Sequence, residues 1–167
     1  MRTLLLEELA RSEKIVRDGV EVVPRFRIVT PEGEFVVMIQ MKDDLADRQE
    51  RLDLMAAFMA WKYASGFIFS VETWLGPSGA LQDAGKRQGE AILSFGVSRD
   101  ERCGAMRTLQ RNPLRFSAPT WLGPEHIEPG LLAMLPARET TIDPPTLKLL
   151  RKAFGPSGWL DAVKLSG

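Results

Sequence analysis

Apolar residues return every three or four positions between residues 44 and 64, and this spacing predicts a long helix with one buried face. Asp43 and Asp44 precede it, and a short carboxylate side chain at a helix start accepts hydrogen bonds from unpaired backbone N–H groups. Gly66 is expected to end the helix. The apolar face carries Leu45, Leu52, Met55, Ala56, Met59 and Tyr63, widened by Phe58 and Trp61.

Residues 67–75 are apolar and rich in aromatic and β-branched side chains, which predicts a β-strand. Side chains alternate across a strand, so one face carries Phe67, Phe69, Val71, Thr73 and Leu75. That face is expected to pack on the long helix. The other face holds one carboxylate, Glu72, and the strand is expected to end at Gly76-Pro77 because proline lacks the N–H that a sheet needs.

Shorter elements surround this helix and strand. A first helix is predicted over residues 3–17, with a stripe of Leu5, Leu9 and Val16. A hairpin of strands 22–30 and 34–41 is predicted, because Pro31 and Gly33 occupy turn positions between them. Further strands are predicted over residues 90–98, 105–111 and 114–122, and a helix over 147–154 after Asp143-Pro144-Pro145.

This order of elements predicts the α+β fold class. We expect a single domain over residues 1–167, with a mostly antiparallel sheet of five or six strands. One long helix packs across the sheet, and small helices follow at the C-terminal end. The proline-rich residues 124–145 are a candidate hinge to a C-terminal helical extension.

Composition adds three expectations. The formal net charge is zero, so no overall field favours nucleic acid or an anionic membrane. A single cysteine, Cys103, excludes an internal disulfide and favours the reducing cytoplasm. No apolar run approaches the roughly 20 residues of a membrane-spanning helix, so no membrane partner is expected.

Glu72 and His126 are the weak catalytic candidates. A carboxylate between Val71 and Trp74 would lose part of its hydration, and this raises proton affinity as a general acid or base requires. The competing interpretation is an exposed Glu72, or one paired with an arginine of a neighbouring strand. His126 is the only histidine, and nitrogen-based metal sites usually use two or more, so neither a metal nor a cofactor is expected. Cys103 lies near Arg99 and Arg102, which would lower its pKa, although a plain turn cysteine is the simpler interpretation.

Nine residues ending at Pro77 return almost unchanged 47 positions later, ending at Pro124, and seven of the nine match. This internal echo favours two neighbouring strands. One interpretation is a ligand-binding groove lined by Trp74, Trp121 and Ser70, because tryptophan offers a large apolar area and one hydrogen-bond donor. The alternative is two strands that end alike and close the core.

A basic stretch follows residue 98, with Arg99, Arg102, Arg107, Arg111 and Arg115. These arginines are candidates for binding an anion or nucleic acid. No aromatic residue lies between them until Phe116, which argues against single-strand binding. The alternative is charge complementarity with the acidic start of the long helix, inside one chain or between two copies.

Three local patterns carry a resemblance to a known group. They are the Ala60-Trp61-Lys62-Tyr63 segment at the end of the long helix, a strand with Ser70, Glu72 and Trp74, and the run from Glu90 to Gly96. In these features residues 35–111 resemble small bacterial and phage-associated α+β proteins of unknown function. The resemblance implies a bacterial or phage source and no particular activity.

These observations favour a non-enzymatic interaction or assembly protein that forms a homodimer. The first alternative is a small-ligand enzyme or binder that uses Glu72, with Trp74 and Trp121 lining the pocket. The second alternative is nucleic-acid binding through the arginines from Arg99 to Arg115. The substrate, the reaction and the identity of any partner are left open.

Overall fold

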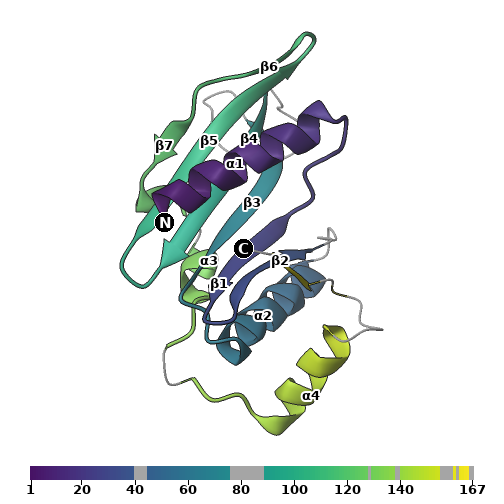
Figure 1. Cartoon of the computed structure of the whole chain (residues 1–167), viewed down its shortest axis with the longest axis vertical. Helices are drawn as coiled ribbons and strands as arrows, with labels where there is room; N and C mark the ends of the chain where they lie inside the picture. Colours follow the sequence, from purple (N-terminus) through teal and green to yellow (C-terminus); the bar gives the residue numbers. More distant parts are fainter. Residues whose placement is uncertain are drawn as a thin grey trace.

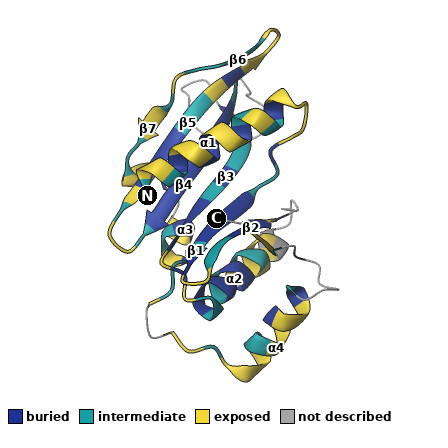
Figure 2. Ribbon diagram, in the orientation of Figure 1, coloured by how far each residue is buried: buried dark blue, intermediate teal, exposed yellow. Residues whose placement is uncertain are grey.

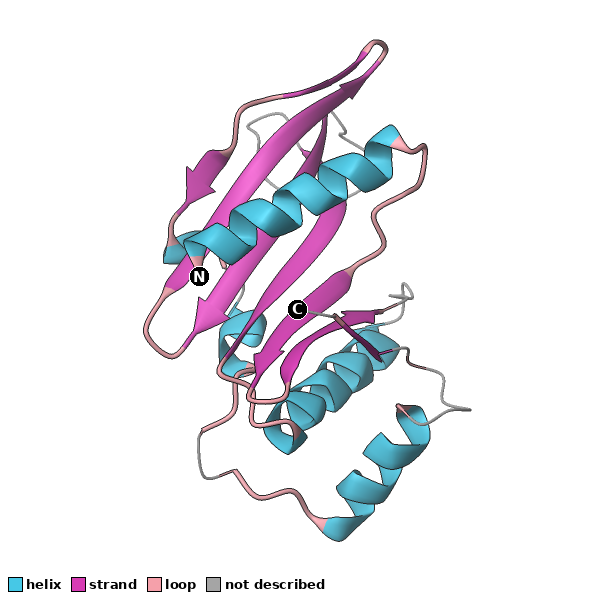
Figure 3. Cartoon of the chain, viewed as in Figure 1, coloured by secondary structure: helices cyan, strands magenta, loops and turns pink. Residues whose placement is uncertain are grey.

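A computed structural model describes residues 1–39, 45–75, 89–127, 129–137, 140–154, 160 and 162–165 of the chain. The fold is α+β, as predicted, and its strands form one antiparallel sheet (Figures 1 and 3). The helices are α1 (Arg2–Arg17), α2 (Leu45–Trp61), η2 (Pro124–His126), α3 (Pro129–Ala133) and α4 (Pro144–Ala153). The strands are β1 (Arg25–Thr30), β2 (Gly33–Met38), β3 (Gly66–Leu75), β4 (Gly89–Ser98), β5 (Arg102–Arg111), β6 (Leu114–Phe116), β7 (Thr120–Leu122) and β8 (Ala162–Lys164).

The sheet has eight strands instead of the five or six that the sequence predicted. Their order is β6-β5-β4-β3-β1-β2-β8, with β7 also paired to β5. The two extra strands arise because the predicted strand over 114–122 is split, and because β8 adds to β2. Pro119 lies in the gap between β6 and β7, and it has no N–H to donate to β5.

The hairpin of β1 and β2 forms as predicted. The hydrogen bonds and backbone angles of its turn explain why Thr30 and Gly33 occur there. Thr30 pairs with Gly33 across the two-residue turn. The Thr30 hydroxyl accepts a hydrogen bond from the Glu32 N–H and donates one to the Gly33 carbonyl. Gly33 has a φ of 117°, which a glycine adopts without the steric cost of a side chain.

Each face of the sheet is covered by a long helix, so the expectation of a single long helix across the sheet needs correction. Figure 1 shows α1 crossing β3, β4 and β5 on one face, where it contacts all three. On the opposite face, α2 packs at the β1–β2 end of the sheet, and α4 packs on α2. The burial pattern in Figure 2 follows this arrangement, with an exposed outer side on α1.

The core of the α2 side contains most of the residues that the long-helix pattern predicted, and Tyr63 is an exception. Met55, Phe58 and Met59 are buried against Phe26, Phe67 and other residues of the sheet. Tyr63 was predicted on the buried face but is 73% exposed, because α2 ends at Trp61 and the chain turns there. The predicted caps Asp43 and Asp44 lie outside the described residues, as does the predicted stop at Gly76-Pro77.

The proline-rich residues after β7 contribute to the same core as the sheet. Ile127, Leu131 and Met134 are buried in the cluster that contains Phe67 and Phe95. The α4 helix begins as predicted, since the Asp143 carboxylate accepts a hydrogen bond from the Thr146 N–H at 2.9 Å. This bond and the one from the Thr146 hydroxyl lower the pKa of Asp143. Apolar burial therefore ties the chain after residue 124 to the sheet, and the hinge there stays a prediction.

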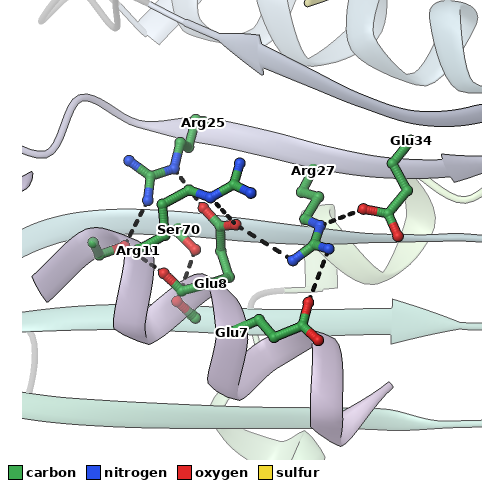
Figure 4. Close-up of polar contacts among 9 residues, drawn as sticks. Glu7, Glu8, Arg11, Arg25, Arg27, Glu34 and Ser70 are labelled. Atoms are coloured by element: carbon green, nitrogen blue, oxygen red, sulfur yellow. Dashed lines mark hydrogen bonds and ion pairs between the residues drawn. The ribbon is translucent and has the colours of Figure 1, made fainter. Parts of the chain in front are cut away.

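The α1 helix carries charged groups on its buried face (Figure 4). Leu5, Leu9 and Val16 form the predicted apolar stripe, but Glu8 and Ser12 share it and are fully buried. These two residues face Arg25 of β1, which is 5% exposed. A buried carboxylate costs several kcal/mol of hydration free energy unless it is paired, so Glu8 of α1 needs the Arg25 side chain of β1 within hydrogen-bond distance.

A continuous ion-pair network joins α1, β1 and β2 (Figure 4). The Arg25 Nε donates to the Glu8 Oε1 at 2.5 Å, and the Arg25 Nη2 donates to the Ser12 Oγ at 2.7 Å. Arg27 donates to Glu34 of β2 at 2.6 Å and to Glu7 of α1 at 3.0 Å. Burial disfavours the charge on Arg27, but these hydrogen bonds outweigh burial and raise the pKa of Arg27.

Removal of one charge from this network is expected to leave buried arginines without compensation. We predict that Glu8→Gln lowers the free energy of unfolding by about 3–5 kcal/mol, measured by urea denaturation. The matched control is Glu32→Gln, which removes a more exposed pair with Lys62 at 3.0 Å. The control is expected to cost less than about 1 kcal/mol. Equal costs for the two variants would contradict a structural role of the network.

Candidate functional site

The sheet face opposite α1 contains a cavity of about 360 Å³ where α2 and α3 leave the strands uncovered. Its floor is made by two paired strands, with Phe69 opposite Phe95 and Val71 opposite Leu93. Thr73 continues the floor along β3. Leu52 of α2 and Leu131 of α3 form apolar walls, and Pro24 closes one side. The cavity is therefore lined mainly by apolar side chains.

Local structure explains why these side chains converge. Phe69, Val71 and Thr73 are alternate residues of β3, so all three point to the same face. Phe69 and Val71 are only partly buried, unlike Phe67, which is fully buried under α2. The prediction that this face packs on the long helix is thus confirmed at Phe67, while Phe69, Val71 and Thr73 line the cavity.

Two basic side chains line the same cavity. Arg48 lies one helical turn before Leu52 on α2, so both side chains face the cavity from one side of the helix. Arg48 is exposed and has no ion pair within the described part of the chain. His126 lies at the end of η2, with its Nδ1 3.2 Å from the Glu125 Oε1. The arrangement offers an apolar floor with the Arg48 guanidinium, which no described residue pairs, at its edge.

Glu72, the first catalytic candidate, lies on the opposite face of the sheet in a second cleft of about 310 Å³. Trp74, Glu90 and Arg111 line this cleft together with residues 19–21. Arg111 donates to Glu72 and, at 2.6 Å, to Glu90, while the Val22 N–H donates to Glu72 at 3.3 Å. The competing interpretation of Glu72 is thus confirmed in its pairing with an arginine, although Arg111 lies on β5, which β4 separates from β3.

The pKa of Arg111 reflects this double pairing. Burial disfavours its charge, but the hydrogen bond with Glu90 and the nearby Glu72 carboxylate outweigh burial and raise the pKa of Arg111. The Arg111 guanidinium is therefore shared by two carboxylates. The N–H groups that donate to Glu72 and Glu90 are not available to a ligand.

The two tryptophans of the internal echo lie at opposite ends of α1. Trp74 lines the cleft beside Gly19 and Val20, just after α1 ends. Trp121 lies under the start of α1, with the Arg2 guanidinium carbon 5.3 Å from its ring centroid. Their strands are not neighbours, because β4 and β5 separate β3 from β7. The expectation of adjacent strands is thus wrong.

Ser70 lies in the interior of the sheet and is fully buried. Its hydroxyl is 2.7 Å from that of Ser94 on β4, and the two serines satisfy each other. Ser70 is separate from the cleft of Trp74 and from Trp121, so the structure does not bring the three proposed ligand-binding residues into one cavity.

The predicted anion-binding arginines are divided among three places. Arg107 pairs with Glu13 of α1 at 2.5 Å, and Arg111 pairs with Glu72 and Glu90. Arg102 is exposed on β5, and Arg99 is exposed in the turn before that strand. These pairings agree with charge complementarity inside one chain, but the partners belong to α1, β3 and β4 instead of the acidic start of α2.

Among the residues that the structure describes, Cys103 and His126 have no partner that would activate them. Burial raises the pKa of the Cys103 thiol, with a smaller contribution from the Glu101 charge, so the hypothesis of a lowered pKa is wrong. His126 is exposed next to Glu125. Within the described ranges, no group of three or more His, Cys, Asp or Glu side chains could hold a metal ion.

Comparisons with protein-family models, curated proteins and solved structures found no match to this chain. None of the helices in the described ranges has the length and apolar character that crossing a bilayer requires.

The residues of the apolar cavity were partly visible in the sequence. Phe69, Val71 and Thr73 were assigned to one face of a strand, and His126 was named for another reason. Arg48 was not among the predicted site residues, and no pattern in the sequence indicated that α2 covers only part of the sheet. The signal that was missed is the presence of more apolar strand surface than one helix can cover.

A larger side chain should fit in the cavity but not in the packed core beside it. We predict that Val71→Phe changes the free energy of unfolding by less than about 1 kcal/mol, because the ring enters existing space. The control is Val37→Phe on the same face, where Val37 is fully buried. Overpacking there is expected to cost about 1–3 kcal/mol in urea denaturation. A large loss for Val71→Phe would show that the cavity is closed in solution.

Proposed function

We propose that this protein is a non-enzymatic binding protein for a small apolar molecule with one carboxylate group. The observation that carries the proposal is the half-open apolar cavity with Arg48 at its edge. Ligand sites are typically mainly apolar, with a few polar groups that fix the orientation of the ligand. A volume of about 360 Å³ lies at the small end of the range for such sites.

The apolar floor of the cavity would bind the tail of the ligand, and Arg48 would bind its carboxylate. Burial of an apolar tail against Leu52, Phe69 and Val71, which are partly exposed, supplies most of the binding free energy, at about 25 cal/mol per Å² of apolar surface. Arg48 supplies a guanidinium for the carboxylate, and such a pair selects the head group of the ligand. No reactive group is required for this role, and the Glu72 cleft lies on the other face of the sheet.

A series of ligands with one tail and different head groups tests this proposal. Decanoate, decanol and decylamine are to be compared by displacement of the fluorescent probe 1-anilinonaphthalene-8-sulfonate. Decanoate is expected to bind most tightly and decylamine most weakly. Arg48→Gln is expected to weaken decanoate about fivefold, since an exposed ion pair contributes up to about 1 kcal/mol. Decanol should bind equally to both proteins.

Arg115→Gln is the matched control, because Arg115 is an exposed arginine on β6 at the far edge of the sheet. This control should leave all three affinities unchanged. If decanol binds as tightly as decanoate and Arg48→Gln has no effect, the carboxylate assignment is wrong. If none of the three displaces the probe, the binding proposal is wrong.

A second proposal is that the protein forms a homodimer through the β2–β8 end of the sheet. Val36 and Val163 are paired residues of these strands, so both side chains lie on the same face as α1. Met38 follows on that face, and Met38 and Val163 are 48% and 53% exposed. Exposed apolar residues that adjoin one another are typical of protein contacts, and a second copy would cover them.

The native mass in solution across a concentration series tests the dimer. Wild type is expected to sediment as a dimer, and Met38→Glu as a monomer, because a carboxylate in the contact would lose its hydration without a partner. Leu149→Glu on α4 is the control, since Leu149 is also exposed, at 45%, but lies away from β2. A wild type that stays monomeric at every concentration would overturn this second proposal.

Three further predictions belong with these proposals. A cytoplasmic location is supported by the free thiol of Cys103. A bacterial or phage source rests only on the resemblance described above. Nucleic-acid binding is less well supported, because Arg107 and Arg111 are already paired with glutamates.

A further inference from the structure

Tyr63 adopts a backbone conformation that is unfavourable for a bulky side chain. Its φ is 52°, in the left-handed region, at the position just after α2 where glycine is usual. The Tyr63 N–H donates to the Ala60 carbonyl, and the Ala64 N–H donates to the Met59 carbonyl. These two bonds are those of a Schellman motif, which a glycine would form without steric cost.

The Tyr63 side chain is 73% exposed, so its packing does little to offset the steric cost of the left-handed backbone conformation. Unfavourable backbone conformations of this kind cluster at functional sites, where the side chain has another use. Tyr63 lines a third cleft of about 530 Å³, between the end of α2, the turn from β4 to β5, and Pro136, Ala137 and Thr140. This cleft is separate from the apolar cavity and from the Glu72 cleft.

Most hydroxyl groups of this cleft already have partners. Ser65 donates to the Val29 carbonyl, Ser98 bonds to the backbone of Glu101, and Thr140 donates to the Ala137 carbonyl. The groups that remain are the Tyr63 ring with its hydroxyl, the Arg99 guanidinium and the Asp100 carboxylate. None of these three side chains has a hydrogen bond or an ion pair within the described ranges.

We propose that this cleft binds a planar heterocycle whose edge carries both acceptors and donors, as a nucleobase does. The ring would stack on Tyr63, an interaction that all nucleobases can make. Arg99 offers only donors and Asp100 only acceptors, so together they match an edge with both kinds of group. The adjacent C-terminal end of α2 disfavours an anion, which argues for the base over a phosphate group. This inference is independent of the proposed carboxylate site.

Equilibrium dialysis with guanosine and uridine tests the proposal, with ribose as the ligand control. Both nucleosides are expected to bind more tightly than ribose. Tyr63→Phe keeps the ring and should keep the affinity, whereas Tyr63→Gly should weaken binding at least about fivefold, by loss of stacking. Arg99→Gln and Asp100→Asn should each weaken binding as well. Arg102→Gln is the matched control, because Arg102 is exposed on the next strand and does not line the cleft.

The stability of Tyr63→Gly separates loss of the site from loss of the fold. Glycine relieves the steric cost of the left-handed conformation, so the Tm of this variant is expected to rise by about 2–4 °C. A more stable protein that has lost nucleoside binding supports the proposal. Nucleosides that bind no better than ribose, or full affinity in Tyr63→Gly, would overturn it. A lower Tm for Tyr63→Gly would also overturn it, because Tyr63 would then have a structural role.

Discussion

The buried pairing of Glu8 with Arg25 constrains the rest of the structure. A fully buried carboxylate requires a cation at hydrogen-bond distance, and here β1 supplies it through an alternate residue that points toward α1. Arg27, two residues further on, extends the network to Glu7 and to Glu34 of β2. The network therefore fixes which face of β1 meets α1, and it leaves Phe26 and Ile28 for the opposite core.

The two faces of the sheet consequently differ in character. The α1 face combines apolar contacts with ion pairs, and its glutamates and arginines bind one another in the network and in the Glu72 cleft. The α2 face is held mainly by apolar packing, and α2 and α3 leave Phe69, Val71 and Thr73 of β3 partly exposed. An apolar ligand can enter the second face without breaking an ion pair. Binding there is compatible with a stable sheet, because the network on the other face is untouched.

The sequence predicted the elements better than their arrangement. Periodicity located α1, α2 and β3, since helix and strand periods appear directly in the order of residues. It could not show that α1 and α2 cover opposite faces, because a buried stripe does not specify its partner. The echo around Trp74 and Trp121 suggested neighbouring strands, but β4 and β5 lie between them. The cavity depends on how far α2 reaches across the sheet, and the role of Tyr63 depends on one backbone angle. Neither is encoded in a local pattern.

In the proposed function, small apolar carboxylates bind in the cavity on the α2 face of the sheet and leave the packing between α1 and the sheet unchanged. Methyl NMR spectra of leucine and valine residues during titration with decanoate test it most directly. Shifts are expected at Leu52, Val71, Leu93 and Leu131, which line the cavity, and none at Leu5, Leu9 and Val16 on the buried face of α1. Shifts confined to the α1 methyl groups, or no shifts at saturating decanoate, would contradict it.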